Sequence, residues 1–326
     1  MNLSFAHLLD PLTGSNFIPQ DNTYKLVFKC GNEYPIIRNI PRFVGGANYA
    51  DDFGWQWNKF KLSQLDSFTG VSASLNRLSR CMDGHLNILA GKKVLEAGSG
   101  AGRFTEILLA KGAIVDSFDY SSAVEANCDN NGKSDNLVLV QADVRHMPFP
   151  KAAYDYVIGL GMIQHTPNSE ETIAHLYSMV RPGGFLVIDH YIFKWIKLLP
   201  PPFGPPQDLC RRIVLLLPKH WRYPVVELTV NFFFPIQWFF RNSLLAKRIL
   251  ARFSPVCFYH NTFGIADKKT LYEWALLDTH DGTTDFYRHL RTVAQLNSYL
   301  SALGASHIKA WEAGNGVELI CQKPFQ

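Results

Sequence analysis

Strand-like and helix-like segments alternate through the middle of the chain. The strand-like runs fall near residues 92–97, 113–119, 137–141, 154–160 and 184–190, and the helix-like segments near 103–111, 121–130 and 169–180. Short apolar runs are typical of strands buried on both faces, and their alternation with amphipathic segments predicts a parallel sheet between layers of helices. The predicted fold class is therefore α/β, with a doubly wound, mostly parallel sheet.

The same pattern resumes towards the C-terminal end. Residues 292–303 predict a helix, and residues 306–311 and 317–322 predict two strands around the turn Gly314-Asn315-Gly316. Turn residues between two strand-like runs are typical of a hairpin. An antiparallel last strand would bring the sheet to seven strands.

A glycine-rich loop joins the first buried strand to the first helix of the alternating region. Its glycines, Gly98, Gly100 and Gly102, occupy every second position and follow Glu96. Glycine permits the backbone angles of a tight turn and lets a ligand approach the main chain, and the following helix offers unpaired N–H groups. An acid at position 96 would repel a diphosphate but accept a cationic amino group. The loop therefore predicts a binding site for a ligand with such a group.

Two further acids follow the next strands. Asp119 ends the second strand, where it can bind ribose hydroxyls, and Asp143 follows the third. In this order the motifs resemble the class I S-adenosylmethionine-dependent methyltransferases, closely over residues 94–190 and more loosely over the C-terminal helix and hairpin. The resemblance implies a Rossmann-like methyltransferase fold with S-adenosyl-L-methionine as cofactor.

The resemblance also implies which residues bind the cofactor. Its methionine part would contact Glu96, the three glycines, Leu160 and Gln164. The ribose would contact Asp119 and its neighbours Tyr120 and Ser121, and the adenine would contact Asp143 and its neighbour Val144. The implied cofactor-binding residues are Glu96, Gly98, Gly100, Gly102, Asp119, Tyr120, Ser121, Asp143, Val144, Leu160 and Gln164.

The pattern divides the chain into four parts. Residues 1–47 resemble a zinc-ribbon flap, but Cys30 is their only cysteine, so no metal is expected because a structural zinc needs four ligands. Residues 48–190 are predicted to form the cofactor-binding core with N-terminal lid helices. Residues 191–289 would form an inserted acceptor cap after the fifth strand, and residues 290–326 would complete the sheet. A plain hairpin packed on the core is the alternative for the flap, and tryptophans that simply pack a helix on the core are the alternative for the lid.

Composition adds an expectation about the compartment. The net charge is only +4, and the six cysteines are scattered without a C-x-x-C pair. Isolated thiols fit a reducing compartment, the first residues lack the features of a signal peptide, and no apolar run reaches the about 18 residues of a membrane-spanning helix. The expected localisation is cytoplasmic.

The insertion is basic and aromatic. Between residues 191 and 266, ten Lys or Arg residues face only Asp208 and Glu227, and Asn231–Phe240 is rich in Phe. Such a segment suits a peripheral membrane contact, because Lys and Arg beside Trp and Phe fit that interface. The favoured alternative is a helical cap with buried aromatics, because prolines are expected to prevent one long amphipathic face. Nucleic acid is not expected, since the charges follow no known reading motif.

Three histidines are candidate bases for an acceptor, because imidazole titrates near neutral pH. His165 and His190 follow the fourth and fifth strands, where ligands bind in such sheets, and His280 lies in a polar stretch with Asp278. For His165 a place in the cofactor pocket or in a turn is favoured over a base. For His190 a packing role is an equal alternative, and a solvated loop is the alternative for the stretch around His280.

The expected function is methyl transfer to a small molecule, with O-methylation of a sugar, lipid-linked or natural-product acceptor as the expected reaction. A catalytically inactive methyltransferase-like binding protein and a nicotinamide-dependent oxidoreductase are the alternatives. The three acids disfavour the first. The G-x-G-x-G spacing, in place of G-x-G-x-x-G, and the closing hairpin disfavour the second. The sequence does not determine the acceptor or the oligomeric state.

Overall fold

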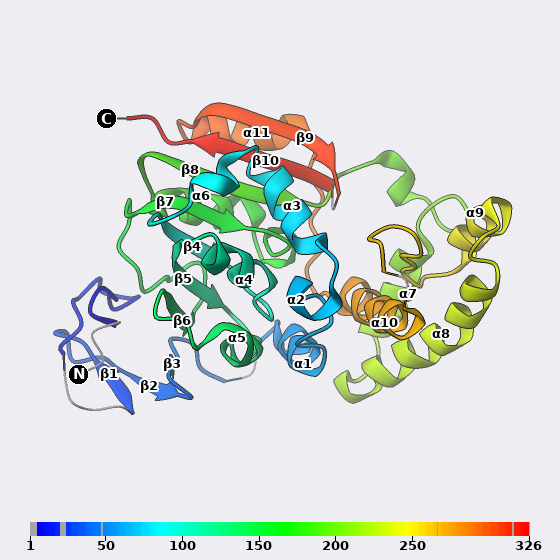
Figure 1. Ribbon diagram of the computed structural model, residues 1–326, viewed down its shortest axis with the longest axis horizontal. Coiled ribbons are helices and arrows are strands. Elements are labelled where there is room, and N and C mark those ends of the chain that lie inside the picture. Colours follow the sequence, from blue (N-terminus) through cyan, green and yellow to red (C-terminus); the bar gives the residue numbers. More distant parts are fainter. Residues whose placement is uncertain (1–4, 20–23, 47, 266, 315, 326) are drawn as a thin grey trace.

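A computed structural model describes residues 5–19, 24–46, 48–265, 267–314 and 316–325 (Figure 1). Its main sheet has seven strands in the order β6-β5-β4-β7-β8-β10-β9. The first five in the chain are parallel, and β10 runs antiparallel to both of its neighbours. The predicted fold class and closing hairpin are therefore confirmed. The strands are β4 (Lys93–Ala97), β5 (Ile114–Asp119), β6 (Leu137–Gln141), β7 (Tyr154–Gly159), β8 (Val180–His190), β9 (Ser306–Ala313) and β10 (Gly316–Gln322).

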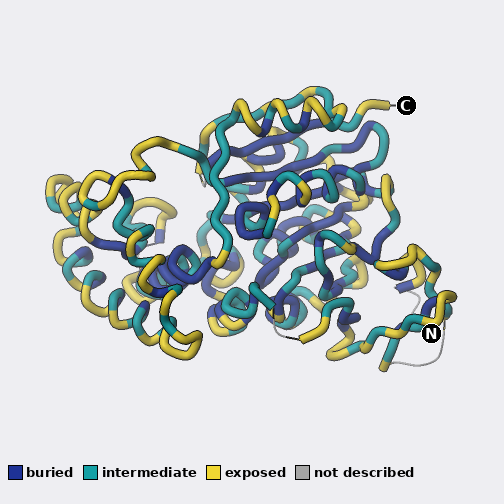
Figure 2. Tube along the Cα trace, turned by 180° about the vertical axis from the view of Figure 1, so that it is seen from behind, coloured by how far each residue is buried: buried dark blue, intermediate teal, exposed yellow. Residues whose placement is uncertain are grey.

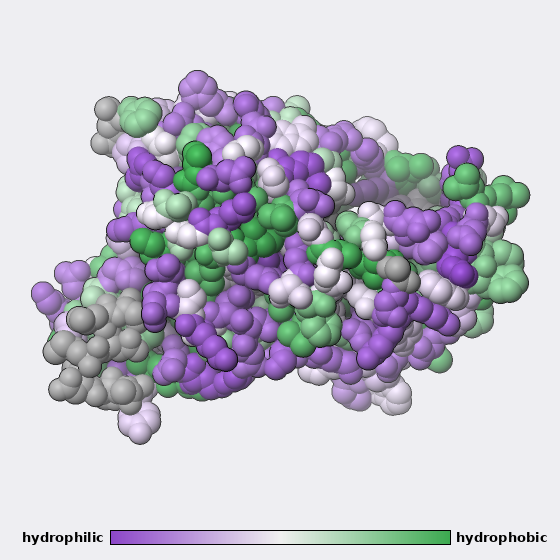
Figure 3. All heavy atoms as spheres, in the orientation of Figure 1, coloured by the Kyte–Doolittle hydropathy of each residue, from purple (hydrophilic) through white to green (hydrophobic). Residues whose placement is uncertain are grey.

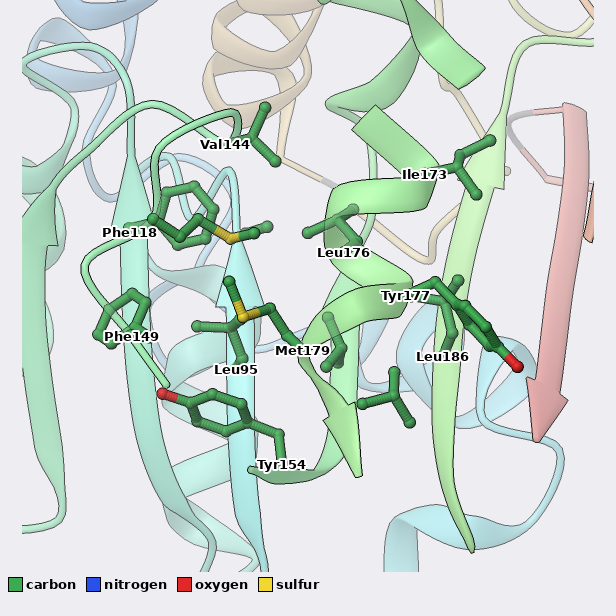
Figure 4. Packing of buried hydrophobic residues seen from close by; sticks show 14 of the residues in the cluster. Leu95, Phe118, Val144, Phe149, Tyr154, Ile173, Leu176, Tyr177, Met179 and Leu186 are labelled. Carbon is green, nitrogen blue, oxygen red and sulfur yellow. The ribbon is translucent and has the colours of Figure 1, made fainter. Parts of the chain in front are cut away.

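Helices cover both faces of this sheet because each strand carries apolar side chains on both sides. On one face Leu95 of β4 packs in a cluster with Leu176 of α6 (Figure 4). On the other face Val94 packs with Leu78 of α3 and Leu108 of α4. The helices of these layers are α3 (Ala73–Cys81), α4 (Arg103–Ala110), α5 (Val124–Asn131), α6 (Ser169–Met179) and α11 (Val293–Ala302).

The N-terminal segment is a small sheet that packs on the edge of the core. Its strands are β1 (Lys25–Val27), β2 (Glu33–Ile37) and β3 (Ile40–Pro41), all antiparallel. Phe28 is fully buried in the cluster around Leu95, and the N–H of Phe43 donates to the carbonyl of Gln141 in β6. The hairpin that is the alternative to a flap is present. Residues 1–4, 20–23 and 47 of the predicted flap lie outside the described residues.

Short helices then connect this segment to β4. They are α1 (Asp51–Lys59), α2 (Asp66–Thr69), α3 and the 3-10 turn η2 (His85–Ile88). The indole of Trp274 in the cap donates to the carbonyl of Ser63, between α1 and α2. This part of the predicted lid region therefore joins the core to the cap.

The insertion after β8 forms a helical cap beside the core, as predicted (Figure 1). Its inner side chains, among them Val226, Phe234 and Trp274, form a separate apolar cluster. The chain enters and leaves the cap at neighbouring points, where Ile192 bridges Arg291. The cap elements are η4 (Trp195–Leu198), α7 (Pro206–Leu215), α8 (Lys219–Phe239), α9 (Leu244–Phe253) and α10 (Lys268–Thr284).

Two expectations about the cap are wrong. The prolines do not interrupt a long helix, because α8 runs through Pro224 and Pro235, and both rings are exposed. Packing of Val226, Val230 and Phe234 on the opposite side holds the helix across both prolines, although each proline removes one backbone hydrogen bond.

The solvated loop expected as the alternative around His280 is also wrong. These residues belong to α10, in which Trp274, Leu277 and His280 are buried. α10 is buried on several sides, and its last two turns bury polar residues such as Thr279, Thr283 and Thr284, so no one-sided apolar pattern marks this helix in the sequence. None of the described helices combines the length and hydropathy that a membrane span requires.

Candidate functional site

The glycine loop makes the tight turn that the sequence predicts. Gly98, Gly100 and Gly102 have φ of 69°, 54° and 86°, in the left-handed region that favours glycine. Two side chains also pack closely on the loop, because neither glycine carries a Cβ. A Cβ atom on Gly98 would lie 2.6 Å from the Met162 side chain, and a Cβ atom on Gly100 would lie 3.1 Å from the Trp57 indole. Side chains of the protein itself therefore approach the loop closely. No motif in the sequence marks Met162, and Trp57 was predicted only as part of the lid segment.

Glu96 lies at the carboxyl end of β4 and is almost completely buried. Its Oε2 accepts hydrogen bonds from the hydroxyls of Thr105 at 2.5 Å and Ser117 at 2.9 Å. Its Oε1 is buried and has no partner among the described residues. Burial raises the pKa of Glu96 to about 7, against the two hydrogen bonds that lower it. One carboxylate oxygen is thus fixed by the fold and the other is left for a ligand.

Two more polar side chains near this edge are buried without partners. They are Ser99 in the glycine loop and Gln164 in η3 (Ile163–His165), where both amide atoms are unpaired within the described chain. Buried polar groups are nearly always hydrogen-bonded, because an unsatisfied one costs about 1–3 kcal/mol. With Glu96 they provide donors and acceptors for a ligand that has both amino and carboxylate groups. These residues therefore fit the amino-acid part of S-adenosylmethionine.

Asp119 connects the end of β5 to the glycine loop. Its Oδ2 accepts from the N–H of Gly100 at 3.0 Å, and its Oδ1 accepts from the N–H and hydroxyl of Ser121 at 2.8 and 2.7 Å. Burial raises its pKa, while these hydrogen bonds oppose the shift. A carboxylate offers about four lone-pair sites, so one remains for a hydroxyl of a ligand. Tyr120 lies beside it and packs on Tyr49 with ring centres 5.1 Å apart.

Asp143, Val144 and Leu160 are already engaged within the protein. The Asp143 carboxylate pairs with Arg145, with 2.6 Å between Nη2 and Oδ2. Burial tends to raise the pKa of Asp143, but the hydrogen bonds from Arg145 outweigh it and the pKa is lowered. Val144 and Leu160 are buried in the two clusters on either side of the sheet. The roles that the resemblance implies for these three residues stay predictions.

Arg103 is a half-buried cation that no motif in the sequence indicated. It begins α4, directly after the third glycine, and its guanidinium donates to the side chain of Gln64. Burial, together with repulsion from Arg77, lowers its pKa to about 10. Arg77 pairs with Asp189, whereas Arg103 makes no ion pair with any described residue. Arg103 therefore suits an anionic group of a ligand at the start of the helix.

Two of the three candidate bases are occupied by structural contacts. His190 is fully buried, and its ring nitrogens lie 3.0 Å from the carbonyl of Tyr191 and 3.1 Å from the hydroxyl of Ser169. The Nδ1 of His280 lies 2.6 Å from the side-chain oxygen of Gln56 in α1. Burial lowers the pKa of each to about 4. Both side chains therefore make structural contacts, and a lowered pKa makes each a weaker base. Their roles as bases stay predictions.

His165 differs from both. Its Nδ1 lies 3.4 Å from Oδ2 of Asp285 and 3.3 Å from the carbonyl of Tyr287. Burial acts to lower the pKa of His165, but the hydrogen bond and charge of Asp285 outweigh burial and raise it. The rings of Phe53 and Tyr191 lie on its sides, at 5.2 and 5.3 Å between centres. His165 is thus a basic imidazole in an aromatic setting between core and cap.

Asp285 is the cap's contribution to this pair. It lies just after α10, is fully buried, and receives Arg211 Nε at 2.6 Å and Arg288 Nε at 2.8 Å. Burial tends to raise its pKa, but His165 and Arg288 lower it, so the carboxylate stays ionised. No sequence signal connects Asp285 to His165, because the two are separated by the whole insertion.

Comparisons with known proteins match the core. Residues 95–188 match a family model described as a methyltransferase domain. These residues are a class I S-adenosylmethionine-dependent methyltransferase domain. The predicted family, and S-adenosyl-L-methionine as its cofactor, are therefore confirmed. The methyltransferase domain includes the glycine loop, Asp119, Asp143 and His165, whereas Asp285 and the cap lie outside it.

The similar proteins cover parts of the chain. A ubiquinone biosynthesis O-methyltransferase from Azoarcus sp. (strain BH72) is 34% identical over 107 residues, which are 32% of this chain and 45% of that protein. One from Pseudomonas savastanoi pv. phaseolicola is 35% identical over 100 residues, 29% of this chain and 43% of that protein. The chain thus spans less than half the length of these relatives. The solved structure of an O-methyltransferase family protein from Burkholderia thailandensis has a TM-score of 0.41 and 14% identity, over 76% of this chain and 57% of that one.

Proposed function

We propose that this chain is an S-adenosylmethionine-dependent O-methyltransferase for a small, hydroxyl-bearing acceptor held between the methyltransferase domain and the cap. The observation that carries the proposal is the pair of His165 and Asp285. This pair places a basic imidazole of the methyltransferase domain beside a buried carboxylate of the cap. The names of the curated relatives, which are O-methyltransferases, support the same reaction type.

Polar groups at the edge of the sheet would hold the cofactor. Glu96 Oε1 would bind its amino group, and Ser99 and Gln164 would make further hydrogen bonds, because these atoms are buried without partners among the described residues. The half-buried Arg103, which makes no ion pair with any described residue, would bind its carboxylate. Asp119 has a lone pair left for a ribose hydroxyl. Bound S-adenosylmethionine supplies a methyl group on a sulfonium, which is electrophilic without a metal or a covalent enzyme intermediate.

The base acts on the acceptor. Nδ1 of His165 faces two acceptors, the carbonyl of Tyr287 at 3.3 Å and Oδ2 of Asp285 at 3.4 Å, which assigns the ring proton to Nδ1 and leaves Nε2 with the free lone pair. Nε2 takes the proton of the acceptor hydroxyl, and Asp285 stabilises the resulting imidazolium. Phe53 and Tyr191 beside the imidazole favour an acceptor with an apolar or ring-shaped body, as a sugar, lipid-linked or natural-product acceptor has, and they keep water away.

The test is transfer of labelled methyl groups from S-adenosylmethionine to phenolic, sugar and lipid-linked hydroxyl compounds and to fractionated extracts. Replacing the base by His165→Gln should lower kcat about a hundredfold or more, since general base catalysis contributes about 10²–10⁴-fold. Cofactor affinity by calorimetry should stay within a factor of two. The rate of the unchanged protein should rise as pH increases through the raised pKa of His165, and the variant should lose this dependence.

The matched control is His175→Gln, which replaces a partly exposed histidine of α6 whose one ion-pair partner in the described part of the chain is the exposed Glu171, 3.8 Å away. It should leave kcat and the pH profile unchanged. Methyl transfer at the original rate by the His165→Gln variant would remove the base from the proposal. Firm binding of S-adenosylmethionine without label in any acceptor would support the binding-protein alternative instead.

A further inference from the structure

The outer side of the cap, formed by residues 195–253 of η4, α7, α8 and α9, is apolar; we call it the outer cap face. More than half of the large apolar side chains that are exposed in the described chain lie in this segment. In Figure 2 these helices are mostly yellow and teal, while most strands of the sheet are largely dark blue. The exposure is therefore concentrated on one part of the molecule.

The long helix α8 is apolar on two opposite sides. One side, with Val226, Val230 and Phe234, is buried in the cap cluster. On the other side, four exposed residues form one stripe: Trp221, Leu228, Phe232 and Phe239. They are 7, 4 and 7 positions apart, which brings them to the same side of a helix with 3.6 residues per turn. A helix that is apolar on both sides is typical of a buried helix, yet the second side of α8 faces solvent.

The helices on either side repeat this feature. In α9 no residue is buried, and Leu245, Ile249 and Phe253 form an exposed stripe at spacings of four. In α7 Ile213 and Leu216 are exposed on the side away from the buried Val214. Short helices in proteins owe most of their stability to burial of their apolar side. The outer stripe of α9 therefore lacks the partner that its sequence pattern requires.

Positive charge accompanies these side chains. Basic residues of the cap that face the core are paired, as Arg222 is with Asp52 and Arg211 with Asp285. Those on the outer cap face make no ion pair within the described part of the chain. They are Arg212, Arg241, Lys247, Arg248 and Arg252.

Two of these arginines line a hollow of about 330 Å³ in the outer cap face. Arg248 and Arg252, one turn apart on α9, share it with Pro202, Phe203 and two apolar residues of the α9 stripe. Figure 3 shows hydrophilic and hydrophobic side chains next to each other over α9. The wall of this hollow is mainly apolar, so it suits a hydrocarbon chain, and Arg248 and Arg252 bring positive charge to its border. The Arg252 guanidinium also donates to the carbonyl of Pro202.

We propose that the outer cap face docks on the surface of an anionic lipid bilayer. Its apolar side chains enter the interface region and its arginines contact lipid phosphates. A bilayer supplies both kinds of partner, since amphipathic helices bind it through apolar burial and through attraction of Lys and Arg to anionic lipids. A second copy of the chain would bring two sets of unpaired cations together, and a nucleic acid would leave the apolar stripes uncovered. The proposal does not depend on the proposed methyl transfer.

The test is sedimentation of the full chain with vesicles of phosphatidylcholine, with and without phosphatidylglycerol, at low and high salt. Binding should require phosphatidylglycerol and weaken with salt. Arg248→Gln with Arg252→Gln should lower the partition coefficient about fivefold for each charge removed. Ile249→Ser with Phe253→Ser should lower it at least tenfold. Folding should persist in each case, because α9 buries no residue.

The control is Phe68→Ser with Ile88→Ser, which removes two equally exposed apolar side chains from the core side: 58% and 57%, against 52% for Ile249 and 60% for Phe253. It should bind vesicles as the unchanged protein does. The proposal is overturned if anionic vesicles do not bind the protein, or if the control lowers binding as much as the α9 variants. It is also overturned if light scattering shows a dimer that Ile249→Ser with Phe253→Ser converts to a monomer, because the outer cap face would then be a contact between copies.

Discussion

In the core, buried polar atoms near the ends of β4 and β7 have no hydrogen-bond partner among the described residues, whereas in the cap the buried carboxylate of Asp285 has several. Glu96 and Gln164 leave hydrogen-bonding capacity for a ligand. Asp285 uses its capacity within the protein, on Arg211 and Arg288. The core thus keeps its polar groups ready for binding, and the cap uses them to fix its position on the core.

The largest predicted effect tests the cap side of this comparison. Asp285→Asn would leave the guanidinium groups of Arg211 and Arg288 without their buried carboxylate, and breaking such a group of charges costs about 3–5 kcal/mol. Chemical denaturation should show this loss of unfolding free energy. The pKa of His165 should fall at the same time, because Asp285 is what raises it.

Asp208→Asn is the matched control. It removes a carboxylate from the other side of Arg288, but this side chain is 32% exposed, and Arg288 retains Asp285. Its effect on stability should be small. Equal losses in the two variants would contradict the idea that Asp285 fixes the cap on the core.

The next effect concerns the glycine loop of the core. In Gly102→Ala the new Cβ would lie 2.2 Å from Oδ1 of Asn127 and 2.4 Å from Nδ2 of Asn131, at a φ of 86°. Strain and displacement together should lower the unfolding free energy by about 3 kcal/mol. Gly304→Ala is the control, since Gly304 has a φ of 81° with nothing within 4 Å, and it should cost only the strain, about 1 kcal/mol. If Gly102→Ala lowered the unfolding free energy no more than Gly304→Ala does, Asn127 and Asn131 would be shown to move aside without cost.

The smallest effect concerns the free oxygen of Glu96. The pKa of Glu96 is raised to about 7, so in the free protein the side chain is protonated below that pH. A cationic amino group favours the ionised form, so affinity for S-adenosylmethionine should rise about tenfold from pH 6 to pH 8, with release of a proton. Calorimetry in buffers of different ionisation enthalpy measures both quantities.

Glu96→Gln is the control for this titration. It should remove the proton release. It should also remove the decrease in unfolding free energy that the free protein shows as pH rises from the ordinary pKa of a glutamate through about 7. Proton release that persists in Glu96→Gln would assign the titration to another group.

The sequence was sufficient for the core because its signals are local. The strand bounds near Val94 and Asp119, the turn at Gly98 and the closing hairpin all follow from residues within a few positions of one another. The same holds for the N-cap of α6, where Asn168 accepts from the N–H groups of Glu170 and Glu171. Local periodicity and turn chemistry decide such features before any tertiary contact forms.

The rest of the site depends on contacts between distant residues. Asp285 meets His165 only after the insertion has folded back, and Met162 approaches Gly98 only across the sheet. The course of α8 through Pro224 and Pro235 is decided by packing in the cap, which outweighs the local effect of proline. Neither spacing nor composition records these contacts. The strand ends and the glycine loop were therefore predictable from local signals, whereas the contacts between core and cap were not. The cofactor-binding roles of individual residues stay predictions.

The chain enters and leaves the cap at one place, where Ile192 bridges Arg291 and the N–H of Phe193 donates to the carbonyl of Arg291. Because these two crossings are neighbours, the insertion leaves the order and connections of the sheet strands unchanged. On the two proposals above, exchange of this segment would alter the acceptor range and the docking surface together, while the donor-binding strands kept their connections. The same connection offers protein engineers a single exchange point.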